Sequence, residues 1–491
     1  MERPDNQRPH PLVSFIPLAI LILLIVVILV WMHDDALNGA SQLALIIASC
    51  ICVAISFIHY HVPWSKFEKS FQQTVGDATI SILILLMIGV MSSTWMISGV
   101  VPTLIYYGVQ FMTPMFYLPC ACIISSLISV MTGTSWTTIA TIGIALLGVG
   151  NAIGIPPALS AGAIISGAYF GDKMSPMSDT TVLASSMAKA DLFSHIRYMM
   201  YTTVPSITIS LLLYLFIGLQ FNGEALETNR YLEGLEHSFN ISLWTMVVPL
   251  LTGLMIYKKV PSIITLILSS LTACLCALVL QPEVVAGIGG SSAITAEGLM
   301  KGIMKVCYTS TQVDTGFAEI NELVSTRGMA GMLNTIWLII CAMCFGACMV
   351  ASGMLSSLTS ILLRHLRHTT SLVASTVTSG VALNMIMGDQ FLSIIMNSSI
   401  FREEYKKRGY RPELLSRSTE DSSTVTSVLV PWTACGMTQS TVLGIPTIVY
   451  LPFCFFNLIS PFMSCAIVAL GIGPTKAIQE TEEEEAKTDS Q

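Results

Sequence analysis

The sequence predicts an all-α polytopic membrane protein with inverted-topology repeats, two re-entrant hairpins and broken helices. The chain has 491 residues, of which only 11% are charged, and its mean hydropathy is +0.72. Soluble domains average about 25% charged residues. Apolar runs of about 18 residues or more recur along the chain, and each is long enough to cross a hydrocarbon core of about 30 Å. The two halves of the chain also repeat one order of continuous and interrupted apolar segments.

The continuous apolar segments are predicted to be membrane-crossing helices. The first is too long for a signal peptide and lacks a small-residue cleavage site close behind it, so we expect it to be retained. The glutamate-rich stretch at the C-terminus has no apolar face, which predicts disorder. The continuous segments are 12–31, 38–58, 77–98, 197–219, 242–257, 261–280, 329–352 and 446–471.

Four further apolar regions are interrupted by Gly, Pro, Asp and hydroxyl residues. The region 116–150 breaks at "MTGTSW", and 370–402 breaks at "IMGDQ". The region 157–188 contains "GDKMSPMSDTT", and 413–440 contains "EDSSTVTS". Interrupted backbone at membrane depth is tolerated only where it is buried in protein or lines a cavity. The first two regions are therefore predicted hairpins and the other two predicted broken helices.

This shared order divides the chain into two predicted repeats. Each contains a span, a short connector, a hairpin, a broken helix and a final span. The predicted divisions are 1–71 with two transmembrane helices, repeat 1 at 72–219, linking helices and an outside loop at 220–324, repeat 2 at 325–471, and an acidic disordered tail at 472–491.

The distribution of basic residues predicts opposite orientations for the repeats. Both flanks of the second hairpin are basic, at Arg364–His368 and Arg402–Arg411, whereas the flanks of the first have no basic residue. Lys and Arg concentrate in cytoplasmic loops. The two hairpins are therefore expected to enter from opposite faces, which gives ten crossing segments, two hairpins, and both termini in the cytoplasm.

Inverted repeats with broken helices are typical of secondary transporters. A hard cation such as Na⁺ prefers oxygen ligands, and the breaks are rich in carboxylates, hydroxyls and amides. Among them Asp179, Asp389 and Asp421 are the predicted Na⁺ ligands. The predicted ion or substrate site comprises Thr132, Thr134, Ser135, Asp172, Ser175, Asp179, Thr180, Thr181, Asn384, Asp389, Gln390, Asp421, Ser422 and Thr424.

A charged residue at membrane depth is costly and usually functional. A buried carboxylate that holds either a proton or Na⁺, under alternating access, exchanges the two ions. Structural alternatives stay open for several residues. Asp172 could form an ion pair with the adjacent Lys173, Asp389 could cap the returning arm of its hairpin, and Asn384 could make a packing hydrogen bond.

Other residue types indicate no cofactor beyond the transported ions. The thirteen cysteines are scattered through apolar segments without nearby His or acidic residues, which favours helix packing over metal binding or disulfides. The expected partners are the lipid bilayer, Na⁺ and H⁺, with no nucleic acid. A small organic anion or amino acid as substrate, and a homodimer, remain open.

Several motifs resemble those of the NhaC family of Na⁺/H⁺ antiporters. They are "GAYFGDKMSPMSDTT" at Gly167–Thr181, "EDSSTVTSVLVPWTACG" at Glu420–Gly436, "GDQFLSI" at Gly388–Ile394 and "GTSWTTIATIG" at Gly133–Gly143. The resemblance implies an antiporter of the bacterial inner membrane, with paired hairpins and an elevator motion. It also implies an alternative, because related exchangers couple Na⁺ or H⁺ to malate, lactate or amino acids.

The chain departs from the family pattern at four positions. Thr137 stands where Gly is expected, Val182 and Thr433 where Asn is usual, and Ser185 where Pro is usual. The loss of two amide side chains leaves room for an organic substrate.

The sequence disfavours two other classes of membrane protein. An intramembrane aspartyl protease would carry Gly-x-Gly-Asp, but "YFGD" at Tyr169–Asp172 lacks the first glycine. A channel with a filter formed by the two hairpins is the other alternative.

Overall fold

The computed structural model is helical throughout the residues that it describes, apart from one bridge between Thr311 and Thr326. Within those residues, nine helices are long and apolar enough to cross a membrane, or up to eleven if each of two bent pairs is one span. The multi-pass membrane architecture is therefore confirmed. The described residues are 9–32, 39–221, 225–258, 260–291, 293–313, 315, 321, 324–363 and 368–473. Most of the predicted acidic tail and four residues of the basic flank at 364–368 lie outside them.

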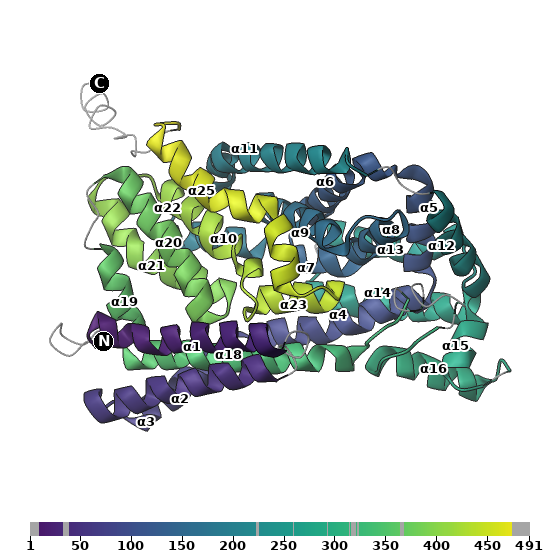
Figure 1. Ribbon diagram of the computed structural model, residues 1–491, viewed down its shortest axis with the longest axis horizontal. Helices are drawn as coiled ribbons and strands as arrows, with labels where there is room; N and C mark the ends of the chain where they lie inside the picture. Colours follow the sequence, from purple (N-terminus) through teal and green to yellow (C-terminus); the bar gives the residue numbers. More distant parts are fainter. Residues whose placement is uncertain are drawn as a thin grey trace, which may run out of the picture.

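The N-terminal helices form one edge of the molecule together with α18, as Figure 1 shows. Here α1 spans Pro11–Met32, α2 spans Ala40–Tyr60 and α18 spans Leu333–Ser352. Between the N-terminal pair and the first predicted repeat lies α3, Trp64–Asp77, which packs on α18 and was not predicted as a separate helix.

The first predicted repeat contains a hairpin that turns at Gly133, a broken helix and a long final helix. Pro114 and Pro157 start helices, where their missing N–H groups leave no hydrogen bond unmade. Asp191 caps α11 by accepting a hydrogen bond from Ser194 N at 2.9 Å, and this bond lowers the pKa of the carboxyl. The elements are α4 Thr79–Ile97, α5 Val100–Phe111, α6 Pro114–Thr132, α7 Ser135–Thr138, a π-helical turn Ile139–Gly143, α8 Ile144–Ala152, α9 Pro157–Met174, α10 Asp179–Ala188 and α11 Leu192–Gly218.

The linking region consists of shorter helices, among which α14 packs on α4 and α13. Its first predicted span, 242–257, is part of a bent pair that turns by 86°. The elements are α12 Ala225–Ser238, η4 Leu243–Met246, α13 Val247–Tyr257, α14 Ser262–Leu280, α15 Pro282–Ile288 and α16 Ala296–Tyr308.

The second predicted repeat follows the same order, but its last span differs from expectation. The segment predicted as the continuous span 446–471 bends by 58° between η8 and α25. Pro452 lies at the bend, and proline cannot continue a helical hydrogen-bond ladder. After η5 Met329–Met332 and α18 come α19 Met354–Leu363, α20 Thr369–Met387, α21 Gln390–Lys407, α22 Pro412–Thr419, the π-helical turn η6 Glu420–Thr424, η7 Ser427–Leu429, α23 Ala434–Leu443, α24 Thr447–Tyr450, η8 Leu451–Phe453 and α25 Phe455–Ala469.

The breaks of the two halves fall at matching positions. Gly133 and Gly388, whose numbers differ by 255, end the first arms of the hairpins with φ of 68° and 67°. Lys189 and Gly444 differ by the same 255 and end the second halves of the broken helices with φ of 61° and 71°. Such recurrence is what a duplicated unit requires. The opposite orientation of the two units in a membrane stays a prediction.

We expect Gly133→Ala to destabilise the protein more than Gly154→Ala. Both glycines have positive φ, which costs an alanine about 1–2 kcal/mol. A Cβ at Gly133 would also lie 2.8 Å from the backbone of Met177, whereas a Cβ at Gly154 meets nothing within 4 Å. Thermal unfolding in detergent should show a clearly larger loss for Gly133→Ala. Equal losses would mean that the hairpin tip does not fit closely against the break.

Candidate functional site

The tip of the first hairpin meets the break between α9 and α10 at a buried carboxylate. Asp172 Oδ2 accepts hydrogen bonds from Ser135 N at 3.1 Å and Ser135 Oγ at 2.7 Å. Ser178 Oγ donates to Asp172 Oδ1 at 2.6 Å. The residue is 4% exposed, so these three donors replace the water that the carboxylate would otherwise bind. The alternative of an Asp172–Lys173 ion pair is wrong, because Lys173 points to another carboxylate.

The tip of the second hairpin meets its own break in a similar way but without a carboxylate between them. Ser427 Oγ donates to Gln390 Oε1 at 3.3 Å, and Thr433 Oγ1 donates to Ser427 O at 2.6 Å. Ala434 N also donates to Gly388 O at 2.8 Å. Ser135/Gln390, Asp172/Ser427 and Ser178/Thr433 are pairs whose numbers differ by 255. The second tip therefore uses neutral groups where the first uses Asp172.

Two predicted site residues in the second half make the structural contacts that the sequence analysis gave as alternatives to ion binding. Asp389 Oδ1 accepts a hydrogen bond from Leu392 N at 3.0 Å and so caps α21. Asn384 Nδ2 donates to Ser423 O at 2.7 Å and to Thr426 Oγ1 at 3.1 Å. Asp389 therefore stabilises the start of the returning hairpin arm, and Asn384 joins the first arm to the break.

A buried ion pair joins the two broken helices. Lys173 Nζ at the end of α9 contacts Asp421 Oδ1 in η6, and both side chains are fully buried. The same oxygen accepts hydrogen bonds from Ser460 Oγ at 2.8 Å and Thr202 Oγ1 at 3.3 Å. The structure thus brings the stretch around 171–181 together with that around 420–424, as the sequence predicted.

Sequence reasoning missed Arg417, which is also fully buried. Its Nε lies 3.9 Å from Asp421 Oδ2, and its guanidinium lies 5.0 Å from the ring centroid of Tyr198. Among the described residues, its three nitrogens make no hydrogen bond. The signal available in the sequence was the spacing, because positions four residues apart share one face of a helix.

Glu420 completes this charged cluster. It is fully buried, and neither carboxylate oxygen has a well-formed hydrogen bond within the described part of the chain. The cluster of Lys173, Arg417, Glu420 and Asp421 contains two basic and two acidic side chains. Buried charges of opposite sign offset part of one another's desolvation cost, and among these four side chains the ion pairs join Lys173 and Arg417 to Asp421.

Most remaining hydroxyls of the predicted site satisfy backbone carbonyls at helix ends. Thr134 and Thr424 are exceptions, because neither hydroxyl makes a hydrogen bond among the described residues. The bonds are Ser175 Oγ to Val130 O at 2.8 Å, Thr181 Oγ1 to Lys173 O at 3.0 Å, Ser422 Oγ to Ser418 O at 2.7 Å and Thr132 Oγ1 to Ser129 O at 3.3 Å, while Thr180 pairs with Ser178 Oγ at 3.0 Å.

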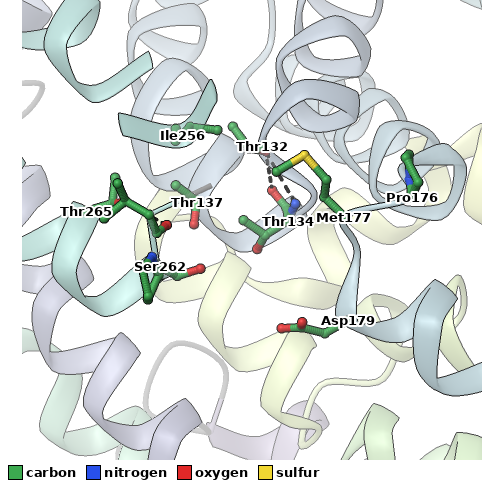
Figure 2. Close-up of a pocket in the computed structure, with 11 residues that line it drawn as sticks. Thr132, Thr134, Thr137, Pro176, Met177, Asp179, Ile256, Ser262 and Thr265 are labelled. Atoms are coloured by element: carbon green, nitrogen blue, oxygen red, sulfur yellow. Dashed lines mark hydrogen bonds between the residues drawn. The ribbon is translucent and has the colours of Figure 1, made fainter. Parts of the chain in front are cut away.

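A cavity of about 350 Å³ lies beside the first hairpin tip (Figure 2). Asp179, at the start of α10, points into it, as do hydroxyls from the hairpin. Asp179, Thr134 and Thr137 make no side-chain hydrogen bond or ion pair with any described residue. The three predicted Na⁺ ligands thus occupy different settings: Asp179 faces a cavity, Asp389 caps a helix, and Asp421 is held in an ion pair.

Comparison with known proteins decides the family. Residues 167–472 match the model of the Na⁺/H⁺ antiporter family. The Na⁺/H⁺ antiporter NhaC of Alkalihalophilus pseudofirmus is 35% identical over 429 residues, which cover 87% of this chain and 90% of that protein. The chain belongs to the Na⁺/H⁺ antiporter family. The resemblance inferred from the motifs is therefore confirmed, and the protein is a transporter that works by antiport.

Relatives of this chain have names that mention different transported solutes. The malate-2H⁺/Na⁺-lactate antiporter of Bacillus subtilis is 32% identical and covers 85% of this chain and 87% of its own. The arginine/ornithine antiporter ArcD of Halobacterium salinarum is 29% identical, and the match covers 98% of this chain and 95% of that protein. Family membership establishes antiport and leaves the solute to be argued from the site.

We expect Lys173→Met to destabilise this antiporter by roughly 3–5 kcal/mol, because it leaves Asp421 buried with only the more distant Arg417 as a cation. Replacing both partners, as Lys173→Met with Asp421→Leu, should recover only part of that loss, because the uncompensated carboxylate is removed but Arg417 loses its acidic neighbour. Thermal unfolding of the purified variants in detergent measures the loss in the single variant and the recovery in the double variant. A single variant as stable as the wild type would show that the ion pair does not hold the broken helices together.

Proposed function

We propose that the protein exchanges Na⁺ for H⁺ across a bacterial inner membrane by alternating access. The observation that carries the proposal is the cavity at the first hairpin tip. There a carboxylate, Asp179, and two hydroxyls, on Thr134 and Thr137, face open space without hydrogen-bond partners among the described residues. Oxygen ligands without competing partners are what a hard cation such as Na⁺ requires.

The proposed ion path runs from this cavity to the buried oxygens behind it. Asp179, Thr132 and Thr134 would meet the ion first, and Asp172, Ser135, Ser175, Thr180 and Thr181 surround the adjoining break. The oxygens of the second half, on Asn384, Asp389, Gln390, Asp421, Ser422 and Thr424, complete the proposed set. Of the three proposed Na⁺ ligands, Asp179 is the most available to an incoming ion. Asp421 is already paired with Lys173, and Asp389 caps the N-terminus of α21.

Exchange follows if Na⁺ and H⁺ compete for the same carboxylate. A carboxylate that is desolvated holds a proton more tightly than one in water, and bound Na⁺ excludes that proton. Alternating exposure of the site to the two sides then exchanges one ion for the other. The paired tips and broken helices support this scheme, because such breaks form the binding sites of many secondary transporters.

An exchanger of organic solutes is the second candidate. A cavity of about 350 Å³ is much larger than a bare Na⁺, since one water occupies about 30 Å³ of liquid. The space suits either a hydrated ion or a small organic solute, and the names of two relatives include malate, lactate, arginine and ornithine. A homodimer and cytoplasmic termini stay predictions.

Proteoliposome flux separates the two candidates. With an imposed Na⁺ gradient, internal pH should change without any organic solute if the protein is a simple Na⁺/H⁺ antiporter. A change that appears only after malate, lactate or an amino acid is added would establish the organic exchanger instead.

We expect Asp179→Asn and Asp421→Asn each to reduce the Na⁺-driven pH change by at least about tenfold, which corresponds to about 1.4 kcal/mol. Each variant removes a carboxylate from the proposed path. Asp191→Asn is the matched control, because Asp191 caps α11 and is exposed. If both site variants fold and still support pH-dependent Na⁺ transport at the wild-type rate, the proposed ion path is wrong.

A further inference from the structure

The cavity at the first hairpin tip has a second wall that neither predicted repeat supplies. It is formed by the end of α13, the turn that follows and the start of α14. These helices lie in the linking region between the two predicted repeats. The residues of this wall are Ile256, Val260, Pro261, Ser262 and Thr265.

Two hydroxyls on this wall face the hairpin. Ser262 and Thr265 are three residues apart in α14 and therefore lie on one face of the helix. The Ser262 hydroxyl makes no hydrogen bond with any described residue, and Thr265 Oγ1 donates only to Val260 O, at 3.3 Å. Figure 2 shows the hydroxyl of Ser262 and the carboxylate of Asp179 pointing into the same space from opposite sides.

The chemistry of the lining selects for a cation. Asp179 is the one charged side chain among the described residues that line the cavity, and the other polar side chains there are hydroxyls. A volume of about 350 Å³ equals roughly twelve waters at about 30 Å³ each. Both a cation with its first shell of water and the ammonium end of a small organic solute fit this volume and this acidic lining.

The two walls are carried by helices whose main neighbours differ, although α13 also contacts α6. The hairpin helix α6 packs mainly on α9, whereas α14 packs on α4 and α13. Ser262 and Thr265 line the cavity from the first turn of α14. A solute in the cavity would contact Asp179 and α14 at the same time.

We propose that Ser262 and Thr265 form the second half of a site for a small cation, opposite Asp179, and that they determine which cation the antiporter accepts. Where that cation is the transported one, the inference rests on the proposed function. The selectivity between cations then comes from α14, which lies outside the broken helices and hairpins.

The first experiment measures the KM for Na⁺ in proteoliposomes. Ser262→Ala with Thr265→Val removes two oxygens while keeping similar volumes. The KM for Na⁺ should rise about tenfold, with kcat within about twofold of the wild type, because each lost hydroxyl weakens binding modestly. Thr272→Val is the matched control, since Thr272 lies on α14, bonds Ser269 O at 2.8 Å and does not line the cavity. An unchanged KM in a folded double variant overturns the proposal.

The second experiment tests binding without relying on transport. Ser262→Cys places a thiol on the wall, and its alkylation at position 262 is followed by mass spectrometry with Na⁺, with ornithine or with neither. Slower alkylation with Na⁺ supports an inorganic cation, and slower alkylation with ornithine alone supports an organic ammonium group. No protection by either, in a variant as stable as the wild type, overturns the site. Protection by ornithine in a protein without Na⁺/H⁺ exchange supports the site and rejects the proposed function.

Discussion

The ion pair between Lys173 and Asp421 is the contact on which the centre of the molecule depends. One carboxylate oxygen gathers Lys173 from α9, Thr202 from α11 and Ser460 from α25 around η6. In a low-dielectric interior, removing one partner of such a pair costs far more than the pair contributes over an apolar equivalent. The four segments must therefore stay together whenever Asp421 is buried and ionised. The hairpin tips are positioned against this unit, through Asp172 in one half and Ser427 in the other.

The two halves repeat their breaks but not their charges. The charged positions Arg417, Glu420 and Asp421 correspond, at the constant difference of 255, to Gly162, Ile165 and Ser166. Conversely, Asp172 and Lys173 correspond to Ser427 and Val428. The first half therefore supplies the lysine and the second half the aspartate, so the pair forms only between the halves. The same asymmetry leaves a carboxylate facing the cavity at the first tip, while the corresponding position 434 is an alanine.

The sequence predicted the breaks because their cause is local. Glycines at positive φ, hydroxyls and carboxylates in otherwise apolar runs mark where a helix cannot continue, and the hairpin tips lie at Gly133 and Gly388 as expected. The partner of Lys173 was not predictable in the same way, because it is 248 residues away in the chain. The role of α14 was also hidden. "PSIITLIL" reads as an ordinary apolar helix start, and only the tertiary structure shows that Ser262 and Thr265 face a carboxylate.

Asp179 and Asp421 present very different conditions to an arriving cation. Asp179 is exposed to the cavity and holds no described partner, so a cation there displaces only water. At Asp421 the cation would have to separate a buried ammonium group from its carboxylate, with a cost of several kcal/mol. For the proposed exchange, a cycle that keeps the Lys173–Asp421 pair closed therefore costs less than one that opens it.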